Sequence, residues 1–386
     1  MRVLQVHAPH REPGGEDAVV AAEAGLLRDH GHAVETLLVP NPASAAGAVL
    51  ALAQSPWNRR GARLVRDAVA RHRPDVVHVH NTWFSLSASS VHAAASAGAP
   101  VVATLHSYRL ACIDGTFFRD GAPCTACQTG RLWPGIRHAC YRGSHVQSSV
   151  ASAAQLVGRR AGVWPDDVTL FLAPTTLVRD LHLGAGIAAD SIVVKPHFVA
   201  DPGSRSSPPS ASDTVVFVGR LAPGKGVETL LAAWRRIAAS GLRLEVLGDG
   251  PLRGALEHAA PPGVSFAGYV GADEVRKRLL GARALVFPSE WHEPFGLVII
   301  EALAAGLPVV ATSTGAAPDA LVGEAQAWLV PPGDTDRLAR AIDELAGDAR
   351  VDAFGAWARG RWQEGYTPAV NLPLLEAAYE RALARR

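Results

Sequence analysis

The chain has 386 residues, 48% of them hydrophobic, and 37 Lys and Arg residues balance 36 Asp and Glu residues to a formal net charge of +1. This length predicts two or three domains, and the near-zero charge excludes a global field that would attract nucleic acid or an acidic membrane. The apolar run over residues 1–6 is too short for a signal peptide, and no apolar stretch approaches the roughly 18 residues of a membrane-spanning helix. We therefore expect a cytoplasmic protein, and its oligomeric state stays open.

The amino-terminal residues predict a β-α-β unit. Residues 2–6 form an apolar strand, residues 18–30 a helix and residues 33–39 a second strand. Gly14 and Gly15 precede the helix, where the backbone can approach a phosphate closely. This pair lacks the G-x-G-x-x-G pattern, so alone it is a weak signal for a ligand.

Two later strands each end next to a histidine. Residues 75–80 end at His80, and residues 100–105 are followed by His106. A parallel sheet binds its ligand at the carboxyl ends of its strands. His80 and His106 are therefore candidate ligand-binding residues, and the alternative is that they are hydrogen-bonded core histidines.

All four cysteines fall within residues 107–143, a segment without strong periodicity. A C-x2-C pair with two further cysteines in a cytosolic chain favours a four-thiolate zinc site over disulfides. A loop of this length also needs an interaction that holds its conformation. Structural zinc is the leading hypothesis, and scattered thiols and a redox pair are the alternatives. The expected ligands are Cys112, Cys124, Cys127 and Cys140.

Residues 195–212 are rich in proline, serine and glycine and predict a linker. We place an N-terminal domain over residues 1–198, a second domain over residues 213–365 and a tail helix over residues 366–386. The second domain opens with an apolar strand at residues 214–218.

The turn after this strand carries Arg220 and Lys225 among three glycines. Glycines allow close backbone approach, and two cations can neutralise a diphosphate. The turn is not a Walker A loop, because G-x4-G-K-[ST] is absent. It predicts a phosphate cradle, and the alternative is a basic surface turn.

Two acids mark the next crossover, which runs from a strand at 284–287 through a helix at 295–305 to a strand at 309–311. Glu293 lies in the loop, and Glu301 interrupts an otherwise apolar helix. Carboxylates are rarely buried without partners, and each offers two acceptor oxygens that suit a vicinal diol. One acid for each sugar ring, with phosphate between them, describes a sugar nucleotide. The alternative is that Glu301 points to water.

Glu293 and Glu301 resemble the E-x7-E signature of family 4 glycosyltransferases, and residues 219–226 (GRLAPGKG) resemble the G-R-x-x-x-x-K-G loop of that family. The resemblance spans nearly the whole chain, is strongest over 214–330 and is weakest over 107–145. It implies a GT-B fold of two Rossmann-like α/β domains facing each other across a donor cleft. It also implies a tail that crosses back to the first domain, retention of anomeric configuration, and no metal or other cofactor in catalysis.

The resemblance also implies roles for single residues. Glu293 meets the donor sugar, Glu301 meets the ribose, and His106 lies beside the donor sugar. The implied catalytic residues are His106 and Glu293. The implied donor-binding residues are Gly15, Arg220, Lys225, Gly268, Val270, Glu293, Phe295, Gly296, Leu297 and Glu301, and the implied acceptor residues are Glu16, Asp17 and His80. For Glu16 and Asp17 the alternative is helix-terminal acids favoured by the helix dipole.

The expected activity is transfer of a hexose or N-acetylhexosamine (glucose or N-acetylglucosamine) from a UDP-sugar to a hydroxyl of a small acceptor. Acids at Glu12, Glu16, Asp17 and Asp114 suit a cationic aminocyclitol such as 2-deoxystreptamine, a resemblance to aminoglycoside-pathway enzymes of antibiotic biosynthesis. The alternatives are a glycosyltransferase of cell-envelope polysaccharide or lipid and a GT-B sugar-nucleotide epimerase. A dinucleotide oxidoreductase would need the missing G-x-G-x-x-G, and a non-catalytic sugar-binding protein would hardly keep both acids and both cations.

Overall fold

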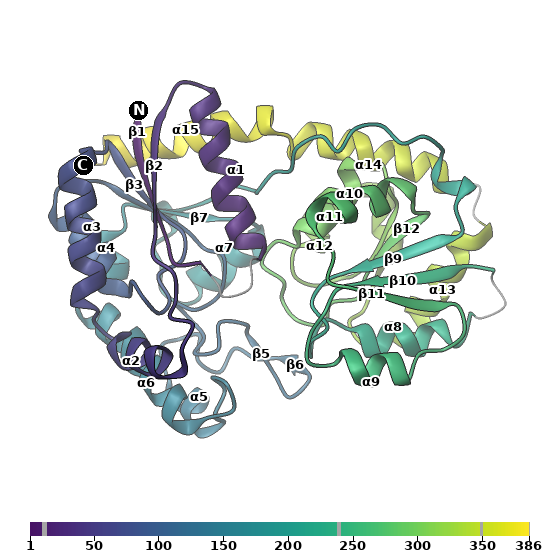
Figure 1. Ribbon diagram of the computed structural model, residues 1–386, viewed down its shortest axis with the longest axis horizontal. Coiled ribbons are helices and arrows are strands. Elements are labelled where there is room, and N and C mark those ends of the chain that lie inside the picture. Colours follow the sequence, from purple (N-terminus) through teal and green to yellow (C-terminus); the bar gives the residue numbers. More distant parts are fainter. Residues whose placement is uncertain (10–13, 238–240, 348–349, 386) are drawn as a thin grey trace. The chain divides into compact units, whose positions relative to one another are not determined.

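The computed structural model describes residues 1–9, 14–237, 241–347 and 350–385 (Figure 1). The chain divides into two compact units. Unit 1 comprises Met1–Phe117, Cys124–His197 and Asn371–Arg386, and unit 2 comprises Phe118–Pro123 and Phe198–Val370. Each unit is built on its own parallel sheet, which confirms the two Rossmann-like α/β domains expected from the sequence.

Unit 1 contains a six-stranded parallel sheet in the order β2-β1-β3-β4-β7-β8. Its strands are β1 (Arg2–His7), β2 (Ala33–Leu38), β3 (Val76–Val79), β4 (Val101–Thr104), β7 (Leu170–Ala173) and β8 (Ile192–Val194). Every residue of β3, β4 and β7 is buried, as expected for parallel strands covered on both faces. The strand order reverses between β1 and β3, so the carboxyl ends of these strands flank the ligand-binding crevice of the sheet.

The helices of unit 1 begin at side chains that cap the free N–H groups of their first turns. Ser44, Asn58, Ser144 and Thr175 each accept a hydrogen bond from a backbone N–H three residues later. The helices are α1 (Gly15–Asp29), α2 (Ala45–Gln54), α3 (Arg59–His72), α4 (Ala88–Ser96), α5 (Trp133–Arg137), α6 (His145–Arg160), α7 (Thr176–Leu183) and α15 (Pro368–Ala384), with single turns at Val163–Asp167 and Ala189–Ser191.

The last helix, α15, contributes to the core of unit 1. Its buried Leu375 and Tyr379 pack in one apolar cluster with Val3 of β1, Leu27 of α1 and Val76 of β3. The helix therefore covers part of a sheet formed by residues far away in the sequence.

Unit 2 repeats the plan with the strand order β11-β10-β9-β12-β13-β14. Its strands are β9 (Thr214–Val218), β10 (Arg243–Leu247), β11 (Val264–Gly268), β12 (Ala284–Phe287), β13 (Val309–Thr312) and β14 (Leu329–Val330). The order reverses between β9 and β12, which pair directly. The loops that follow these two strands therefore lie next to each other.

Helices that each bury at least one apolar residue complete the core of unit 2. They are α8 (Val227–Trp234), α9 (Arg253–His258), α10 (Ala272–Gly281), α11 (Leu297–Ala304), α12 (Ala317–Ala320), α13 (Thr335–Gly347) and α14 (Val351–Gly365), with short 3-10 turns at Pro209–Ala211 and Gly323–Trp328. The unit also includes a small antiparallel hairpin, β5 (Phe118–Arg119) with β6 (Ala122–Pro123), which the sequence did not predict. Among the helices described here, none combines the length and apolarity needed to cross a membrane.

Candidate active site

In unit 2, the loops after β9 and β12 bring together two of the residues singled out from the sequence. Lys225 Nζ lies 2.6 Å from Glu293 Oε2. Trp291 Nε1 donates a hydrogen bond to the same oxygen at 2.7 Å, and the Lys225 ammonium lies 5.1 Å from the centroid of the Trp291 ring. Glu293 Oε1 accepts no hydrogen bond from the residues that the structure describes. One oxygen of this carboxylate is therefore fixed, and the other can accept from a ligand hydroxyl.

Close backbone contacts at two glycines hold these loops in place. A Cβ at Gly226 would lie 1.9 Å from the carbonyl oxygen of Pro288, and one at Gly315 would lie 2.6 Å from the backbone nitrogen of Glu293. Both glycines also have positive φ angles, 71° and 61°, which favour glycine. The loop positions of Lys225 and Glu293 thus depend on residues without a side chain.

Glu301 lies on α11, in a setting unlike that of Glu293. Its carboxylate makes no hydrogen bond or ion pair with the described part of the chain, and burial raises the pKa of Glu301. A partly buried carboxylate without a partner is unfavourable and is stabilised by any donor that reaches it. Glu301 therefore favours a ligand that brings hydroxyl groups.

The remaining donor-side candidates of unit 2 lie around the same sheet edge. Arg220 is exposed two positions after β9, Gly268 ends β11 with φ 71°, and Val270 follows it half-buried. Phe295 is buried in the core, with its ring 6.2 Å from that of Tyr366. Gly296, in the left-handed region at φ 71°, is the N-cap of α11, and Leu297 is its first residue.

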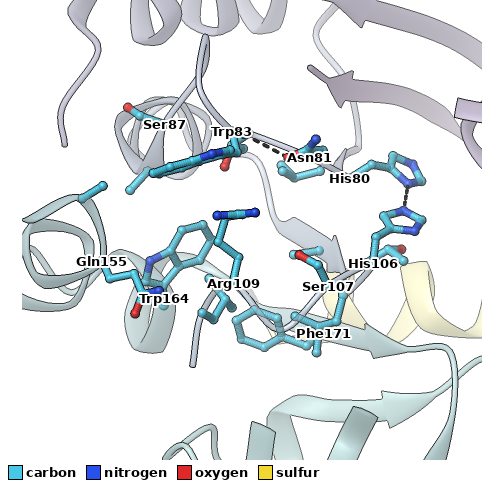
Figure 2. Close-up of a pocket in the computed structure, with 18 of the residues that line it drawn as sticks. His80, Asn81, Trp83, Ser87, His106, Ser107, Arg109, Gln155, Trp164 and Phe171 are labelled. Carbon is cyan, nitrogen blue, oxygen red and sulfur yellow. Dashed lines mark hydrogen bonds between the residues drawn. The ribbon is translucent and has the colours of Figure 1, made fainter. Parts of the chain in front are cut away.

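Unit 1 has a pocket of about 90 Å³ at the carboxyl ends of β3 and β4 (Figure 2). Three of the sequence-derived candidates, Glu16, His80 and His106, line it. Asp17 does not line it, because its carboxylate lies 2.9 Å from His7 Nε2 and accepts from the Gly14 N–H at 2.8 Å. Asp17 therefore acts as a residue of the α1 helix start.

The other residues of the amino-terminal half that were predicted to bind donor or acceptor lie at different places. Gly15 is the exposed first residue of the helix, and Glu16 follows it half-buried. Glu12 lies outside the described residues. Asp114 is not part of the pocket lining; its backbone carbonyl accepts from Arg109 at 3.2 Å.

The aromatic and basic wall of this pocket was not among the residues predicted from the sequence. Figure 2 shows Trp83, Arg109 and Trp164 on the side opposite the His80–His106 pair. The Arg109 guanidinium lies 4.8 Å from the Trp83 ring centroid and 5.4 Å from the Tyr141 ring centroid. Trp83 stands three positions after His80 in a strand-end loop, which was an available signal. Arg109 and Trp164 lie in segments without a recognisable pattern.

A column of four imidazoles, three of them buried and that of His106 half-buried, runs beside the pocket. The ring centroids of His78 and His80 lie 4.1 Å apart, those of His80 and His106 5.3 Å apart, and those of His106 and His197 5.1 Å apart. Burial lowers the pKa of all four, and that of His78 falls to about 4. The column is therefore neutral at pH 7. Strand alternation places His78 and His80 on one face, so the sequence carried a signal for this pair.

A buried ion pair between Glu23 and Lys195 lies next to this column. Burial raises the pKa of Glu23, but the Lys195 ammonium and His78 outweigh it and leave the pKa below its ordinary value. Glu23 Oε2 lies 3.8 Å from His78 Nδ1 and 3.9 Å from His80 Nε2. The carboxylate is therefore charged and faces both imidazoles.

Glu23, His78 and His80 also form the one set of three close metal-ligating side chains among the residues described. The set does not fit a metal ion, because Lys195 already neutralises the carboxylate. In addition, His78 uses both ring nitrogens, Nδ1 at 2.8 Å from the Tyr379 hydroxyl and Nε2 at 2.8 Å from Thr104 Oγ1.

The zinc hypothesis for the four cysteines gains no support. None of the four cysteines forms a disulfide with another described residue, and no three of them come within ligand range of one another in the described chain. Cys127 is buried in a small apolar cluster, Cys112 packs against the main core of unit 1, and burial raises the pKa of Cys127. These two thiols behave as small apolar core residues.

Two family models match the chain. Residues 13–200 match the model described as Glycosyltransferase Family 4, and residues 212–348 match the model described as Glycosyl transferases group 1.

Several curated proteins are similar in sequence. An uncharacterized glycosyltransferase of Methanocaldococcus jannaschii, MJ1607, is 35% identical over 140 residues, which are 35% of this chain and 36% of that protein. A GDP-mannose-dependent alpha-mannosyltransferase of Mycobacterium tuberculosis is 30% identical over 73% of this chain and 67% of its own length. Glycogen synthase of the same species is 28% identical over 75% of this chain and 64% of its own length. The matches thus span from about a third to two thirds of these relatives.

Solved structures share the fold. Anabaena Alr3699/HepE in complex with UDP and glucose has a TM-score of 0.65 at 19% identity, with coverage of 98% of this chain and 99% of that one. Sucrose-phosphate synthase of Thermosynechococcus elongatus has a TM-score of 0.72 at 18% identity, with full coverage of both chains. These similarities support the same two-domain α/β fold.

Proposed function

Because the chain belongs to the family 4 glycosyltransferases of the GT-B type, we propose that it transfers a hexose or N-acetylhexosamine from a UDP-sugar to a hydroxyl of a small acceptor. The observation that carries this proposal is the contrast between the two acids of unit 2. Glu293 has one oxygen fixed by Lys225 and Trp291, and Glu301 is partly buried with no partner among the described residues.

In the proposed complex, Glu301 accepts from the ribose diol, and its partial burial strengthens those hydrogen bonds. Lys225 and Arg220 neutralise the diphosphate, and Glu293 Oε1 accepts from a hydroxyl of the sugar. The GT-B neighbour HepE, whose solved complex contains UDP and glucose, supports UDP-glucose as a donor. UDP-N-acetylglucosamine is the second donor to test.

GDP-mannose is the competing donor, because a mannosyltransferase that depends on it is 30% identical over most of this chain. The base is proposed to lie near Gly268 and Val270, where a backbone turn discriminates poorly between bases. Donor choice therefore has to be measured.

We propose that the transfer retains the anomeric configuration. The bond between the anomeric carbon and the diphosphate oxygen breaks, the acceptor oxygen forms a bond on the same face, and the acceptor proton passes to the departing phosphate oxygen. The cations then neutralise the charge that develops on the leaving group. NMR of the product tests this step, since an inverted linkage would contradict it.

The acceptor is proposed to bind in the pocket of unit 1, with its ring against Trp83 or Trp164. A cationic aminocyclitol such as 2-deoxystreptamine, and with it a role in antibiotic biosynthesis, now rests on Glu16, the one acid in the described lining. Arg109, on the wall opposite the His80–His106 pair, favours neutral or anionic sugars of a polysaccharide or lipid acceptor. A sugar-nucleotide epimerase would instead convert the donor with no acceptor present.

The test is a thermal-shift screen of the whole protein with UDP-glucose, UDP-N-acetylglucosamine and GDP-mannose, followed by mass spectrometry with candidate acceptors. Stabilisation by one nucleotide sugar is expected, and Glu301→Gln should reduce it, because an uncharged amide oxygen accepts weaker hydrogen bonds than a carboxylate. Glu344→Gln, which changes an exposed acid on α13, is the matched control and should keep it. No stabilisation by any nucleotide sugar would contradict the proposal.

A further inference from the structure

His80 lies between the pocket residue His106 and the buried carboxylate of Glu23. Its Nδ1 lies 3.0 Å from His106 Nε2, the contact drawn in Figure 2. Its Nε2 lies 3.9 Å from Glu23 Oε2, and neither of these two buried atoms has a hydrogen-bond partner among the residues that the structure describes. The imidazole therefore faces a second imidazole on one side and a charged oxygen on the other.

A neutral imidazole carries one proton, which can sit on either nitrogen. With the proton on Nδ1, the lone pair of His80 Nε2 would face the lone pairs of Glu23 Oε2 with no donor between them. With the proton on Nε2, the positive end of the N–H dipole lies on the nitrogen 3.9 Å from the negative Glu23 oxygen, an attraction that the low dielectric of the interior strengthens. The second arrangement is favoured, so Nδ1 of His80 is the acceptor.

This choice decides the tautomer of the next histidine. If His80 Nδ1 accepts, His106 Nε2 has to donate, and His106 Nδ1 keeps its lone pair. Nδ1 of His106 makes no hydrogen bond with the described part of the chain, and the His106 side chain lines the pocket. Stacking of its ring on His197, with centroids 5.1 Å apart, holds its orientation.

We infer that His80 is a positioning residue that fixes His106 as the Nε2–H tautomer, so that His106 presents an acceptor, and no donor, to a substrate hydroxyl. We call the series of contacts from Glu23 through His80 to His106 the relay. It depends on the buried Glu23–Lys195 pair, because Lys195 keeps the carboxylate charged and in place. The group recognised is a hydroxyl that can donate, as sugars supply. That last step rests on the proposed function, whereas the tautomer itself does not.

The direct test is NMR of the wild-type protein labelled with ¹⁵N-histidine at pH 7.5. Two-bond ¹H–¹⁵N correlations distinguish a protonated ring nitrogen from an unprotonated one, and His106→Gln and His80→Gln spectra assign the two rings. We expect protonated Nε2 and unprotonated Nδ1 at both His80 and His106. A protonated Nδ1 at either ring would overturn the inference.

A kinetic test separates positioning from packing. His80→Leu removes the acceptor for His106, whereas His80→Asn keeps a polar group that can accept. We expect His80→Leu to lower kcat about 2- to 12-fold, the effect of one lost hydrogen bond, and to populate the Nδ1–H tautomer of His106. His80→Asn should restore most of kcat and the Nε2–H spectrum. His92→Gln, at an exposed histidine of α4, should change neither.

Failure of the proposed function and failure of the relay would give different results. If no nucleotide sugar is bound or turned over but the Nε2–H tautomers are found, the proposed function fails and the relay stands. If transfer occurs while His106 carries its proton on Nδ1, or if His80→Leu is folded with unchanged kcat and tautomer, the relay fails and the proposed function stands.

Discussion

Both units carry polar residues at the point where the strand order of the sheet reverses, but the burial of these residues differs between the units. In unit 1, at the reversal between β1 and β3, the ionisable groups are buried and contact one another. In unit 2, at the reversal between β9 and β12, Lys225 and Glu293 are partly exposed, with 23% and 16% of their side chains accessible. In unit 1 the imidazoles are neutral and the charges of Glu23 and Lys195 are paired with each other. In unit 2 the charges of Lys225 and Glu293 remain partly accessible to a ligand.

The largest effect that should follow from this difference is on stability. Glu23→Ala leaves the Lys195 ammonium buried without a partner, so we expect a loss of about 3–5 kcal/mol in the free energy of unfolding of unit 1. Urea unfolding followed by hydrogen exchange of each unit measures it. Replacing both partners, Glu23→Leu with Lys195→Met, should recover most of the loss. Asp213→Ala, which breaks an exposed ion pair with Arg243 in unit 2, should leave the stability unchanged. Equal losses of stability at the two sites would contradict the difference between the buried pair of unit 1 and the exposed pair of unit 2.

In unit 2, loss of charge should affect ligand binding more than stability. Lys225→Ala and Glu301→Ala each remove charge-assisted hydrogen bonds of about 1.5–3 kcal/mol, which corresponds to roughly 10- to 150-fold in donor affinity or turnover. Isothermal titration with the donor and steady-state kinetics measure the effect. Because Glu301 contacts no hydrogen-bond or ion-pair partner in the described part of the chain, Glu301→Ala should not lower the melting temperature. Unchanged kinetics in both variants would mean that the donor binds elsewhere.

Acid should destabilise unit 1 before unit 2. Burial lowers the pKa of His78 from 6.5 to about 4, so the unfolded chain binds this proton below pH 6.5 while the folded unit does not. Stability therefore falls as the pH drops from 6.5 toward 4, by about 2 kcal/mol between pH 7 and pH 5 for His78 alone. The lowered pKa values of His80, His106 and His197 act in the same direction. Hydrogen exchange at pH 7 and pH 5 checks this, and unit 2, with two histidines in its sequence, should change less. Equal loss in both units would contradict it.

The smallest expected effect concerns the wall of the unit 1 pocket. Trp83→Leu removes the ring that contacts the Arg109 guanidinium, an interaction of about 0.5–1 kcal/mol. We expect the KM for the acceptor to rise about two- to fivefold and the KM for the donor to stay unchanged. A change in donor KM alone would show that this pocket does not serve the acceptor.

Much of the fold was predictable from the sequence because it depends on local signals. Apolar runs such as residues 76–79 and 284–287 are typical of buried parallel strands, and glycines at helix ends and loops mark the crossovers. The loops of Lys225 and Glu293 were predictable for the same reason, since each directly follows such a strand. Their direct contact follows from the neighbouring positions of β9 and β12, which one strand alone does not reveal.

The rest depends on contacts between distant parts of the chain. Glu23 and Lys195 are 172 positions apart, and neither carries a sequence signal for the other. The cysteines illustrate the opposite error, because their spacing suggested a metal site while two of the thiols face apolar cores. Spacing indicates which residues can meet, but burial and packing decide whether they do.

The final helix has a consequence for biosynthesis. Tyr379 of α15 contacts His78, and α15 completes an apolar cluster with strands that are synthesised before unit 2. All of unit 2 leaves the ribosome before Asn371–Arg386 does, and domains generally fold as units during synthesis. Part of the sheet of unit 1 therefore stays uncovered until α15 emerges from the ribosome. Unit 2 can complete its core before unit 1 does, although most of unit 1 is synthesised first.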